Sequence, residues 1–228
     1  RMTTEFATRD GWIAAVRGVS FDVLGGKTLV VLGESGSGKS VMLRSILRIT
    51  APGARLAGSV RYNGRNLLEC SEKEMRKIRG NRMAMIFQNA LSAFDPLYRV
   101  GDQIVETIVT HQGGSRAKAA RKAVELLAKV GIPSPQERMS VYPHEMSGGM
   151  RQRAVIAMAL ACKPDILLAD EPTTALDVTV QAQILQLFKE IQAEYGMSIV
   201  MVTHDIGVAM EMADDIAVMY AGQIVEIG

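Results

Sequence analysis

Residues 33–40 combine glycines, a lysine and a serine at a spacing that suits phosphate binding. They fit the pattern of a glycine, four variable residues and a final Gly-Lys-Ser or Gly-Lys-Thr, in the order Gly33, Glu34, Ser35, Gly36, Ser37, Gly38, Lys39 and Ser40. Glycines let successive backbone N–H groups converge on one anion. Lys39 can reach the β- and γ-phosphates, and the Ser40 hydroxyl can ligate the Mg²⁺ that bridges them. The pattern predicts a nucleotide phosphate site.

The segments on either side supply the context that this motif needs. Residues 28–32 are a short apolar run typical of a strand, and residues 41–47 have the pattern of the opening of a helix. Strand, glycine loop and helix together place the phosphates at the positive end of a helix dipole. A glycine-rich turn with an exposed lysine would explain the loop but not both flanks.

Polar side chains stand directly after three further apolar runs. The runs and the side chains that follow them are 83–87 with Gln88, 166–169 with Asp170 and Glu171, and 198–203 with His204. Continuous apolar runs separated by amphipathic helices predict an α/β fold with a mainly parallel sheet covered on both faces. Ligands of such sheets collect at the carboxyl ends of the strands. We therefore expect these side chains and the phosphate loop to converge on one site.

Each of these side chains has a chemical role open to it. Asp170 can hold Mg²⁺ directly or through water, and Glu171 can polarise a water for in-line attack on the γ-phosphate. Gln88 can orient that water or contact the metal, and His204 can contact the γ-phosphate. The alternatives are a solvated turn for the two carboxylates and a structural role for the histidine.

Two weaker patterns also allow nucleotide contacts. Phe6 and Trp12 are early aromatic residues, and either could stack on an adenine ring or cover a sheet edge. Ser147, Gly148 and Gly149 precede an apolar helix. They could form a second anion site at a helix N-terminus or only a turn that leads into the helix.

A basic helix lies between these motifs. Ser115 can cap it, and its cations are Arg116, Lys118, Arg121, Lys122 and Lys129. Such a face is either solvated or a surface for an anionic partner.

Composition indicates an ordinary globular chain. The 228 residues are 48% hydrophobic and 22% charged, and the net charge of +2 gives no electrostatic case for nucleic acid. Cys70 and Cys162 are far apart and lack metal-ligand spacing, which is typical of reduced thiols in a cytosolic protein. No apolar stretch approaches the roughly 18 residues that span a bilayer, and no signal peptide is evident.

The motifs, taken in order, resemble those of the ATP-binding-cassette (ABC) ATPases along nearly the whole chain. That family has a Walker A loop, a Q-loop glutamine, an SGG signature, a Walker B Asp-Glu pair, a D-loop and an H-loop histidine. Their counterparts here are 33–40, Gln88, Ser147 to Gly149, Asp170 with Glu171, 175–177 and His204. The resemblance implies a cassette that binds and hydrolyses ATP with Mg²⁺.

The resemblance also implies a domain plan. A RecA-like ATP-binding core with an N-terminal antiparallel β subdomain would occupy residues 1–88 and 162–228, and a helical signature subdomain would be inserted at 89–161. Members often carry a C-terminal extension, which is absent from this sequence, so we expect the chain to be trimmed.

Site residues follow from the resemblance motif by motif. Catalysis is assigned to Glu171, His204 and Gln88, and Mg²⁺ to Ser40, Gln88 and Asp170. Besides the loop 33–40, nucleotide contacts are assigned to Phe6, which is favoured over Trp12, and to Ser147, Gly148, Gly149 and Asp177.

In the family, two cassettes pack head to tail, and the Ser-Gly-Gly of one closes on the γ-phosphate held by the other. The implied partners are therefore a second ATP-binding subunit, identical or paralogous, and transmembrane permease subunits that dock near 88–98. A substrate-binding protein would act indirectly, and no nucleic acid is expected. The implied location is the cytoplasmic face of the inner membrane.

Finer features are similar to the branch that imports peptides or nickel complexes, in the segments 87–96, 100–104, 146–153 and 170–179. Met150 is typical of this branch, whereas Met146 replaces the commoner leucine and 87–90 lacks the usual acidic-Pro pair.

Two other classes remain as alternatives. A non-transport cassette that acts on DNA or ribosomes usually has a long coiled coil before the signature or two cassettes per chain, and no heptad run occurs here. The second alternative is a regulator that binds nucleotide without hydrolysing it, and the presence of Glu171 and His204 disfavours this class.

Overall fold

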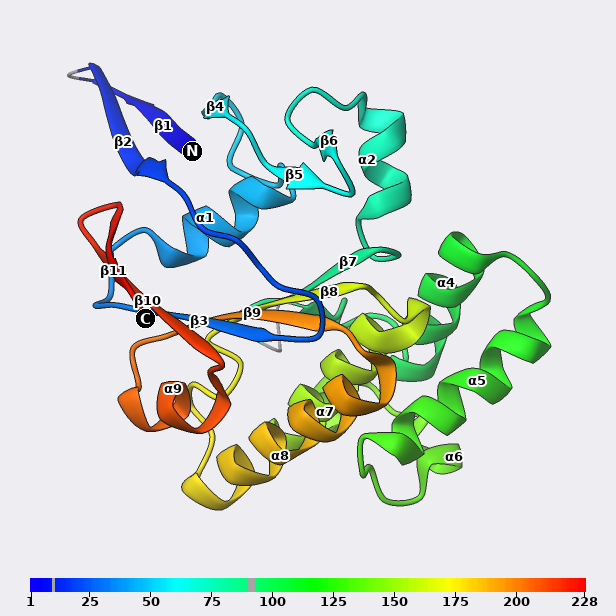
Figure 1. Ribbon diagram of the computed structural model, residues 1–228. Helices are drawn as coiled ribbons and strands as arrows, with labels where there is room; N and C mark the ends of the chain where they lie inside the picture. Colours follow the sequence, from blue (N-terminus) through cyan, green and yellow to red (C-terminus); the bar gives the residue numbers. More distant parts are fainter. Residues whose placement is uncertain (10, 90–92) are drawn as a thin grey trace. The chain divides into compact units, whose positions relative to one another are not determined.

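The computed structural model describes residues 1–9, 11–89 and 93–228, which form two compact units (Figure 1). The first unit comprises 1–79 and 198–228, and the second comprises 80–197. These units group elements by packing, whereas the predicted domains 1–88 with 162–228 and 89–161 follow motif positions. That domain plan stays a prediction.

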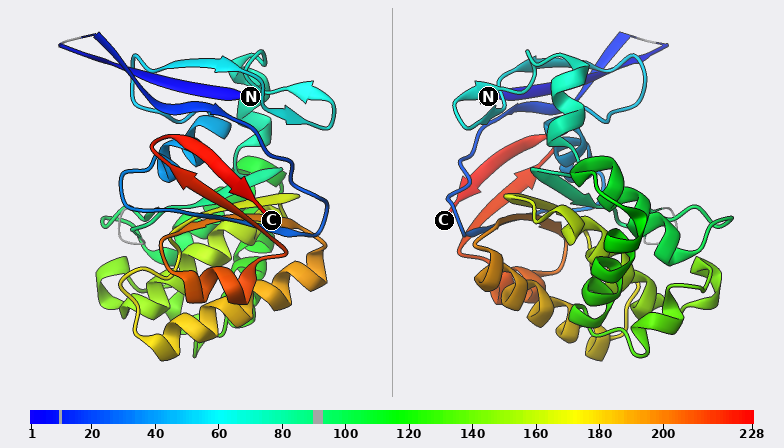
Figure 2. Two further views of the ribbon diagram at one scale, coloured as in Figure 1. Left: turned by 60° about the vertical axis from the view of Figure 1, so that its left-hand side comes forward. Right: turned by 90° about the vertical axis from the view of Figure 1, so that its right-hand side faces the viewer.

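The first unit contains two groups of strands. An antiparallel sheet has the order β2-β1-β4, with β1 at Met2–Thr8, β2 at Gly11–Val19 and β4 at Arg55–Gly58. The second group has the order β11-β10-β3-β9, with β3 at Thr28–Leu32, β9 at Ser198–Thr203, β10 at Asp215–Tyr220 and β11 at Gln223–Ile227. Strands β10, β3 and β9 are parallel, and β11 returns antiparallel to β10. Figure 2 shows the β1–β2 and β10–β11 hairpins in dark blue and red.

Three helices and a small hairpin complete the first unit: α1 (Lys39–Ile46), α2 (Glu72–Ile78), α9 (Ile206–Met212), β5 (Arg61–Tyr62) and β6 (Arg65–Asn66). The turn between β5 and β6 is Asn63-Gly64, and both residues have positive φ, 47° and 77°. This is the conformation that a tight hairpin turn requires, and asparagine and glycine tolerate it best.

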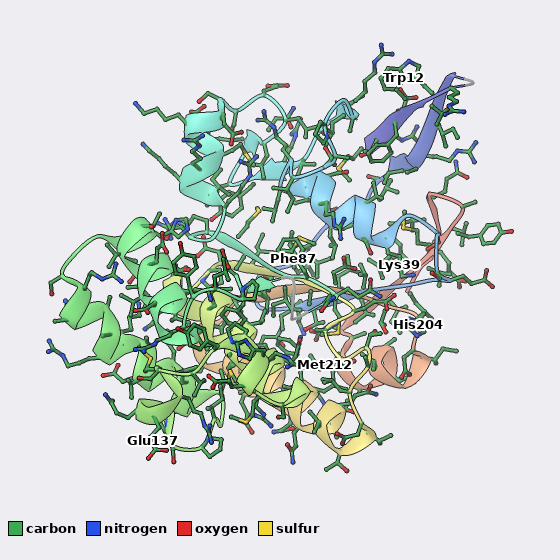
Figure 3. The ribbon with its side chains drawn as sticks, turned by 180° about the vertical axis from the view of Figure 1, so that it is seen from behind. Trp12, Lys39, Phe87, Glu137, His204 and Met212 are labelled. Atoms are coloured by element: carbon green, nitrogen blue, oxygen red, sulfur yellow. The ribbon has the colours of Figure 1, made fainter. Side chains whose placement is uncertain are left out.

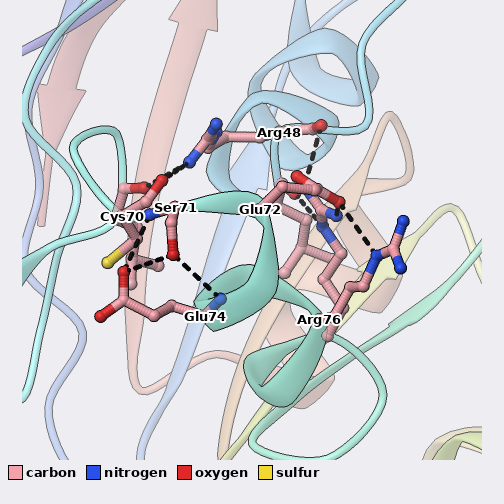
Figure 4. A network of polar contacts seen from close by, with 9 residues as sticks. Arg48, Cys70, Ser71, Glu72, Glu74 and Arg76 are labelled. Carbon is pink, nitrogen blue, oxygen red and sulfur yellow. Dashed lines mark hydrogen bonds and ion pairs between the residues drawn. The ribbon is translucent and has the colours of Figure 1, made fainter.

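A capping box starts α2 (Figure 4). The Ser71 Oγ accepts a hydrogen bond from the Glu74 N–H (3.4 Å), and the Ser71 N–H donates to the Glu74 carboxylate (2.9 Å). The Glu74 carboxylate also accepts from the Ser71 hydroxyl and the Arg65 guanidinium. Together these bonds, those from Ser71 foremost, lower the pKa of Glu74 to about 2.

The second unit pairs β7 (Met83–Ile86) in parallel with β8 (Ile166–Asp170). Its helices in the described ranges include α4 (Val100–Gln112), α5 (Arg116–Lys129), α6 (Pro135–Arg138), α7 (Gly148–Ala159) and α8 (Val178–Tyr195), with short 3₁₀ turns η1 (Pro143–Glu145) and η2 (Leu160–Cys162). Helix α4 packs on α5, and α5 packs on α7. Over the three described ranges, none of the helices combines the length and the apolar character needed to cross a bilayer.

Each unit has its own core. In the first, β9 is buried along its whole length and pairs with β3, and the buried residues of β3 and α1 include Val30, Val31, Met42 and Leu43. In the second, the largest fully buried side chains include Ile104, Leu127, Ile156, Leu167 and Phe188. Burial of both faces explains why the parallel strands are continuous apolar runs. The predicted parallel strands and the predicted N-terminal antiparallel sheet are confirmed.

Candidate active site

The phosphate-loop motif forms the connection between β3 and α1, as predicted. The Gly33 N–H donates to the Thr203 carbonyl at the end of β9 (3.3 Å). The Lys39 ammonium is buried and donates to the carbonyl oxygens of Gly33 and Glu34, both at 2.7 Å. The loop therefore curls around its own lysine and holds the positive charge at the N-terminal end of α1.

Two glycines of the loop are fixed by close backbone neighbours. A Cβ on Gly33 would lie 2.3 Å from the Met219 carbonyl oxygen, and one on Gly38 would lie 2.4 Å from the Ala15 carbonyl oxygen. Gly38 also has a φ of 101°. Gly36 has a positive φ of 82°, but nothing would lie within 4 Å of its added Cβ. Residues 33 and 38 therefore need glycine for space, whereas residue 36 needs it only for backbone conformation.

A β-bulge brings the N-terminal sheet against this loop. The register of β1 and β2 shifts between the pairs Thr4–Val16 and Glu5–Ala14, so Ala15 is an extra residue of β2. Its carbonyl is the atom that approaches Gly38. A hydrogen bond of 2.7 Å between the hydroxyls of Thr4 and Ser45 joins β1 to α1. The sheet thus supports both the loop and the helix that follows it.

The two aromatic candidates for adenine stacking lie in the N-terminal sheet. Phe6 is half-buried and opposite Ile13, and strand alternation puts it on the same face of β1 as Thr4. Trp12, labelled in Figure 3, has the Arg55 guanidinium 3.6 Å above its ring centre. Because Arg55 covers one face of Trp12, Phe6 remains the favoured residue for adenine stacking. Its contact with adenine stays a prediction.

His204 follows β9 directly and is exposed. The neighbouring Asp205 caps α9, where its carboxylate accepts hydrogen bonds from the N–H groups of Gly207 (2.7 Å) and Val208 (3.3 Å). The Thr203 carbonyl, one residue before His204, is the acceptor for Gly33. The first unit therefore brings His204 to the start of the phosphate loop, and both Lys39 and His204 are labelled in Figure 3.

The second unit brings Gln88 to Glu171. In the parallel pair, Ile86 of β7 is in register with Ala169 of β8, and the two polar residues each follow two positions later. The Gln88 side-chain N–H donates to Glu171 Oε2 at 3.0 Å. Gln88 is exposed, whereas Glu171 and the adjacent Asp170 are buried. Register alone therefore explains why residues far apart in sequence meet at this strand end.

A third residue, Thr174, also contacts Glu171. Its hydroxyl donates to Glu171 Oε2 (2.9 Å), and its backbone N–H donates to the Glu171 carbonyl (3.2 Å). Glu171 has a positive φ of 45°, which is uncommon outside glycine and asparagine. This left-handed residue turns the chain so that Thr174 faces the carboxylate. Thr174 has no role predicted from the sequence, because the turn that brings it back to Glu171 has no recognisable sequence signal.

The signature and the D-loop each begin a helix of the second unit. The exposed Ser147 caps α7 by accepting from the Met150 N–H (3.3 Å), and Asp177 caps α8 by accepting from the Val180 N–H (2.9 Å). A Cβ on Gly149 would lie 2.9 Å from Val180 Cγ1, so the first turns of the two helices are in contact. Residues 147–149 thus form the turn that begins α7, and nucleotide contacts by these residues stay a prediction.

The proposed Mg²⁺ donors are a hydroxyl of Ser40, a carboxylate of Asp170 and an amide of Gln88. Oxygen donors of this kind fit Mg²⁺, which is usually held by one or two carboxylates together with phosphate oxygens and water. Within the described ranges, no group of three or more His, Cys, Asp or Glu side chains gathers to hold a metal. Besides Ser40 and Gln88, a metal held through Asp170 would take further ligands from phosphate oxygens and water.

The basic face of α5 uses several of its cations in local contacts. Lys122 donates to Gln112 Oε1 (2.7 Å), and Lys129 forms an ion pair with Glu194 and donates to the Tyr195 hydroxyl (2.9 Å). Burial lowers the pKa of Lys122. These contacts favour the interpretation of a structural and partly solvated face. Residues 90–92, within the predicted permease-docking segment 88–98, lie outside the described residues.

A family model described as "ABC transporter" matches residues 16–174. The chain is 52% identical over 225 residues to the dipeptide transport ATP-binding protein DppD of Bacillus subtilis (strain 168), covering 98% of this chain and 67% of the relative. It is 50% identical over 229 residues to the oligopeptide transport ATP-binding protein OppD of the same strain, covering 100% of this chain and 64% of the relative. The chain therefore spans about two thirds of the length of these curated relatives.

Solved structures are similar along the whole chain. A dimeric structure of MJ0796, described as a bacterial ABC transporter cassette, has a TM-score of 0.87 at 28% identity and covers 100% of this chain and 98% of its own. A dimeric post-hydrolysis state of the same cassette, bound to ADP and Pi, has a TM-score of 0.85 at 27% identity and the same coverage. The cassette fold predicted from the motifs is thereby confirmed.

Proposed function

Because the chain belongs to the ABC transporter family, we propose that it is the ATP-hydrolysing subunit of a membrane importer for peptides. The observation that carries this proposal is the identity of about half of all residues to dipeptide and oligopeptide transport ATP-binding proteins over nearly the whole chain. The ordered set of motifs and the loop around Lys39 support nucleotide binding independently of those names.

In the proposed function, the phosphate loop binds the β- and γ-phosphates of ATP through its backbone N–H groups and Lys39. Phe6 stacks on the adenine, and His204 contacts the γ-phosphate. Ser40, Asp170 and Gln88 would hold Mg²⁺, and the bound ion would neutralise charge that develops on the phosphate oxygens. These roles rest on motif identity and on the oxygen-donor chemistry of the side chains.

Hydrolysis requires a base at the carboxyl end of β8. Glu171 accepts a proton from a water as the water oxygen forms a bond to the γ-phosphorus. The bond from that phosphorus to the bridging oxygen breaks, and ADP leaves with the electron pair. The products are ADP and inorganic phosphate, and the proton is later released from Glu171 to solvent.

We further propose that two cassettes act together. In a head-to-tail dimer, Ser147, Gly148 and Gly149 of one chain supply donors to the γ-phosphate held by the other, and Asp177 lies at the same interface. ATP then completes the interface and hydrolysis removes the bridge, so the dimer closes and opens. The motion is passed to permease subunits at the cytoplasmic face of the membrane, which receive peptide from a binding protein.

Peptide uptake tests this function. In cells that lack the chromosomal gene, the wild-type gene should restore uptake of a labelled dipeptide or oligopeptide, and Glu171→Gln should not, although the variant protein accumulates to the same level. Restored ATP hydrolysis without peptide uptake would contradict the substrate class. Salt-sensitive DNA binding by the wild-type protein would instead favour the non-transport alternative.

A further inference from the structure

The loop after β8 contains a hydroxyl that no motif assigns. Thr174 bonds Glu171 twice, once from its backbone N–H to the carbonyl (3.2 Å) and once from its hydroxyl to the carboxylate oxygen Oε2 (2.9 Å). The hydroxyl and the backbone N–H of Thr174 therefore hold the carboxylate and the backbone carbonyl of Glu171 respectively. We propose that Thr174 is a positioning residue for hydrolysis, which holds the Glu171 carboxylate in the orientation that accepts the proton of water. This inference rests on the proposed function, because it concerns the base of that reaction.

The backbone explains why such a support is needed. Glu171 is buried and has a φ of 45°, and left-handed conformations of this kind persist only where surrounding contacts determine them. Bonds from Thr174 N–H to Glu171 O and from Leu176 N–H to Thr173 O form two successive turns directly after the glutamate. The first of these turns brings Thr174 back to the carboxylate that it bonds.

Gln88 and Thr174 donate to the same oxygen, Oε2 of Glu171, at 3.0 and 2.9 Å. The two donors differ in origin. Thr174 is three residues from Glu171 on the same loop, whereas Gln88 comes from the end of another strand and is the proposed metal contact. If the Gln88 amide were to bind the metal instead, Thr174 would be the one of these two donors that still holds the Glu171 carboxylate.

The chemistry of the contact determines what its loss should do. A hydroxyl that donates to a carboxylate stabilises the ionised form. Its removal frees the carboxylate to rotate, and small displacements of a catalytic group lower the rate without a matching loss of substrate binding. A hydroxyl with only a structural role in the turn would affect unfolding instead.

The test compares Thr174→Val, which keeps the shape and removes the donor, with Thr174→Ser, which keeps the donor. Thr110→Val is the control, since Thr110 is exposed on α4 and undergoes the same chemical change. For Thr174→Val we expect kcat for ATP hydrolysis to fall roughly 10-fold with KM within about 2-fold, and the acidic limb of the pH–rate profile to move to higher pH. Thr174→Ser and Thr110→Val should keep wild-type kcat and the wild-type acidic limb.

A second measurement needs no turnover. NMR titration of glutamate labelled at the side-chain carboxyl carbon, with the Glu171 signal assigned by its loss in Glu171→Gln, should show Glu171 protonating at higher pH in Thr174→Val than in the wild type. An unchanged titration together with an unchanged kcat in Thr174→Val would overturn the positioning role. Normal hydrolysis by Glu171→Gln would instead show that Glu171 is not the base. In that case the NMR titration of Glu171 in Thr174→Val would still test whether Thr174 holds the Glu171 carboxylate.

Discussion

The phosphate loop of the first unit and the β8 strand end of the second unit are built in different ways. Around Lys39 the geometry is set by the backbone: two glycines lie where a Cβ would collide with neighbouring carbonyls, and two carbonyls accept hydrogen bonds from the ammonium. At Glu171 it is set by side chains, because the contacts come from the Gln88 amide and the Thr174 hydroxyl. The loop should therefore be sensitive to added volume, and the strand end to lost hydrogen-bonding groups.

The largest effect is expected at the strand end. Glu171→Gln keeps the volume and removes the base, so hydrolysis should slow by roughly 10²- to 10⁴-fold while Mg-ATP still binds. The variant should then accumulate as an ATP-bound dimer. Steady-state phosphate release and light scattering after gel filtration with ATP measure the two effects. Turnover at the wild-type rate would remove Glu171 as the base.

In the phosphate loop, Lys39→Ala removes a charge that lies inside the curl of backbone. ATP affinity should fall roughly 10- to 100-fold, because hydrogen bonds to charged groups contribute about 1.5–3 kcal/mol. Calorimetric titration with ATP measures the change. Lys73→Ala is the matched control, since Lys73 is exposed in α2. Equal affinities of the two variants would contradict the role of Lys39.

Substitutions at two glycines of the loop distinguish the effect of added side-chain volume from the effect of backbone conformation. Gly38→Ala adds a Cβ that would lie 2.4 Å from the Ala15 carbonyl, whereas Gly36→Ala adds one with nothing within 4 Å. Both sites have positive φ, so both variants should lose about 1 kcal/mol of unfolding free energy. Only Gly38→Ala should lose about 1–3 kcal/mol more. Urea unfolding would contradict the steric argument if the two variants proved equally stable.

The smallest effect concerns a helix cap outside both sites. The pKa of Glu74 is lowered to about 2 from its ordinary 4.5 by the hydrogen bonds of the capping box. Its contribution to stability is therefore present above about pH 4.5 and is lost as the pH falls towards 2. Glu74→Gln should make the urea midpoint less dependent on pH in this window and leave ATP hydrolysis at neutral pH unchanged. An identical pH dependence in both proteins would show that the cap contributes nothing.

The difference between the two regions also explains what could be predicted from sequence. The phosphate loop is local, so the spacing of Gly33, Gly38 and Lys39 predicts its position between a strand and a helix. Asp170, Glu171, Gln88 and His204 were predicted at strand ends, and they lie there. The pairing of Gln88 with Glu171 adds the register of β7 and β8, which a single sequence does not specify.

Other features depend on geometry that has no sequence signal. The Ala15 carbonyl reaches Gly38 because of a register shift in β2, and alanine is not typical of a bulge. Thr174 reaches Glu171 because the glutamate adopts a positive φ. Neither conformation follows from residue type, since both are imposed by the packing around them.

The contact between Gly149 and Val180 has a consequence for how the starts of α7 and α8 can move. Because a Cβ added to Gly149 would lie 2.9 Å from Val180 Cγ1, the starts of α7 and α8 are closely packed against each other. A displacement of the turn at Ser147 to Gly149 would therefore also displace the first turn of α8, which Asp177 caps. In the proposed head-to-tail dimer, which places both turns at the interface, the two turns would then move as one body.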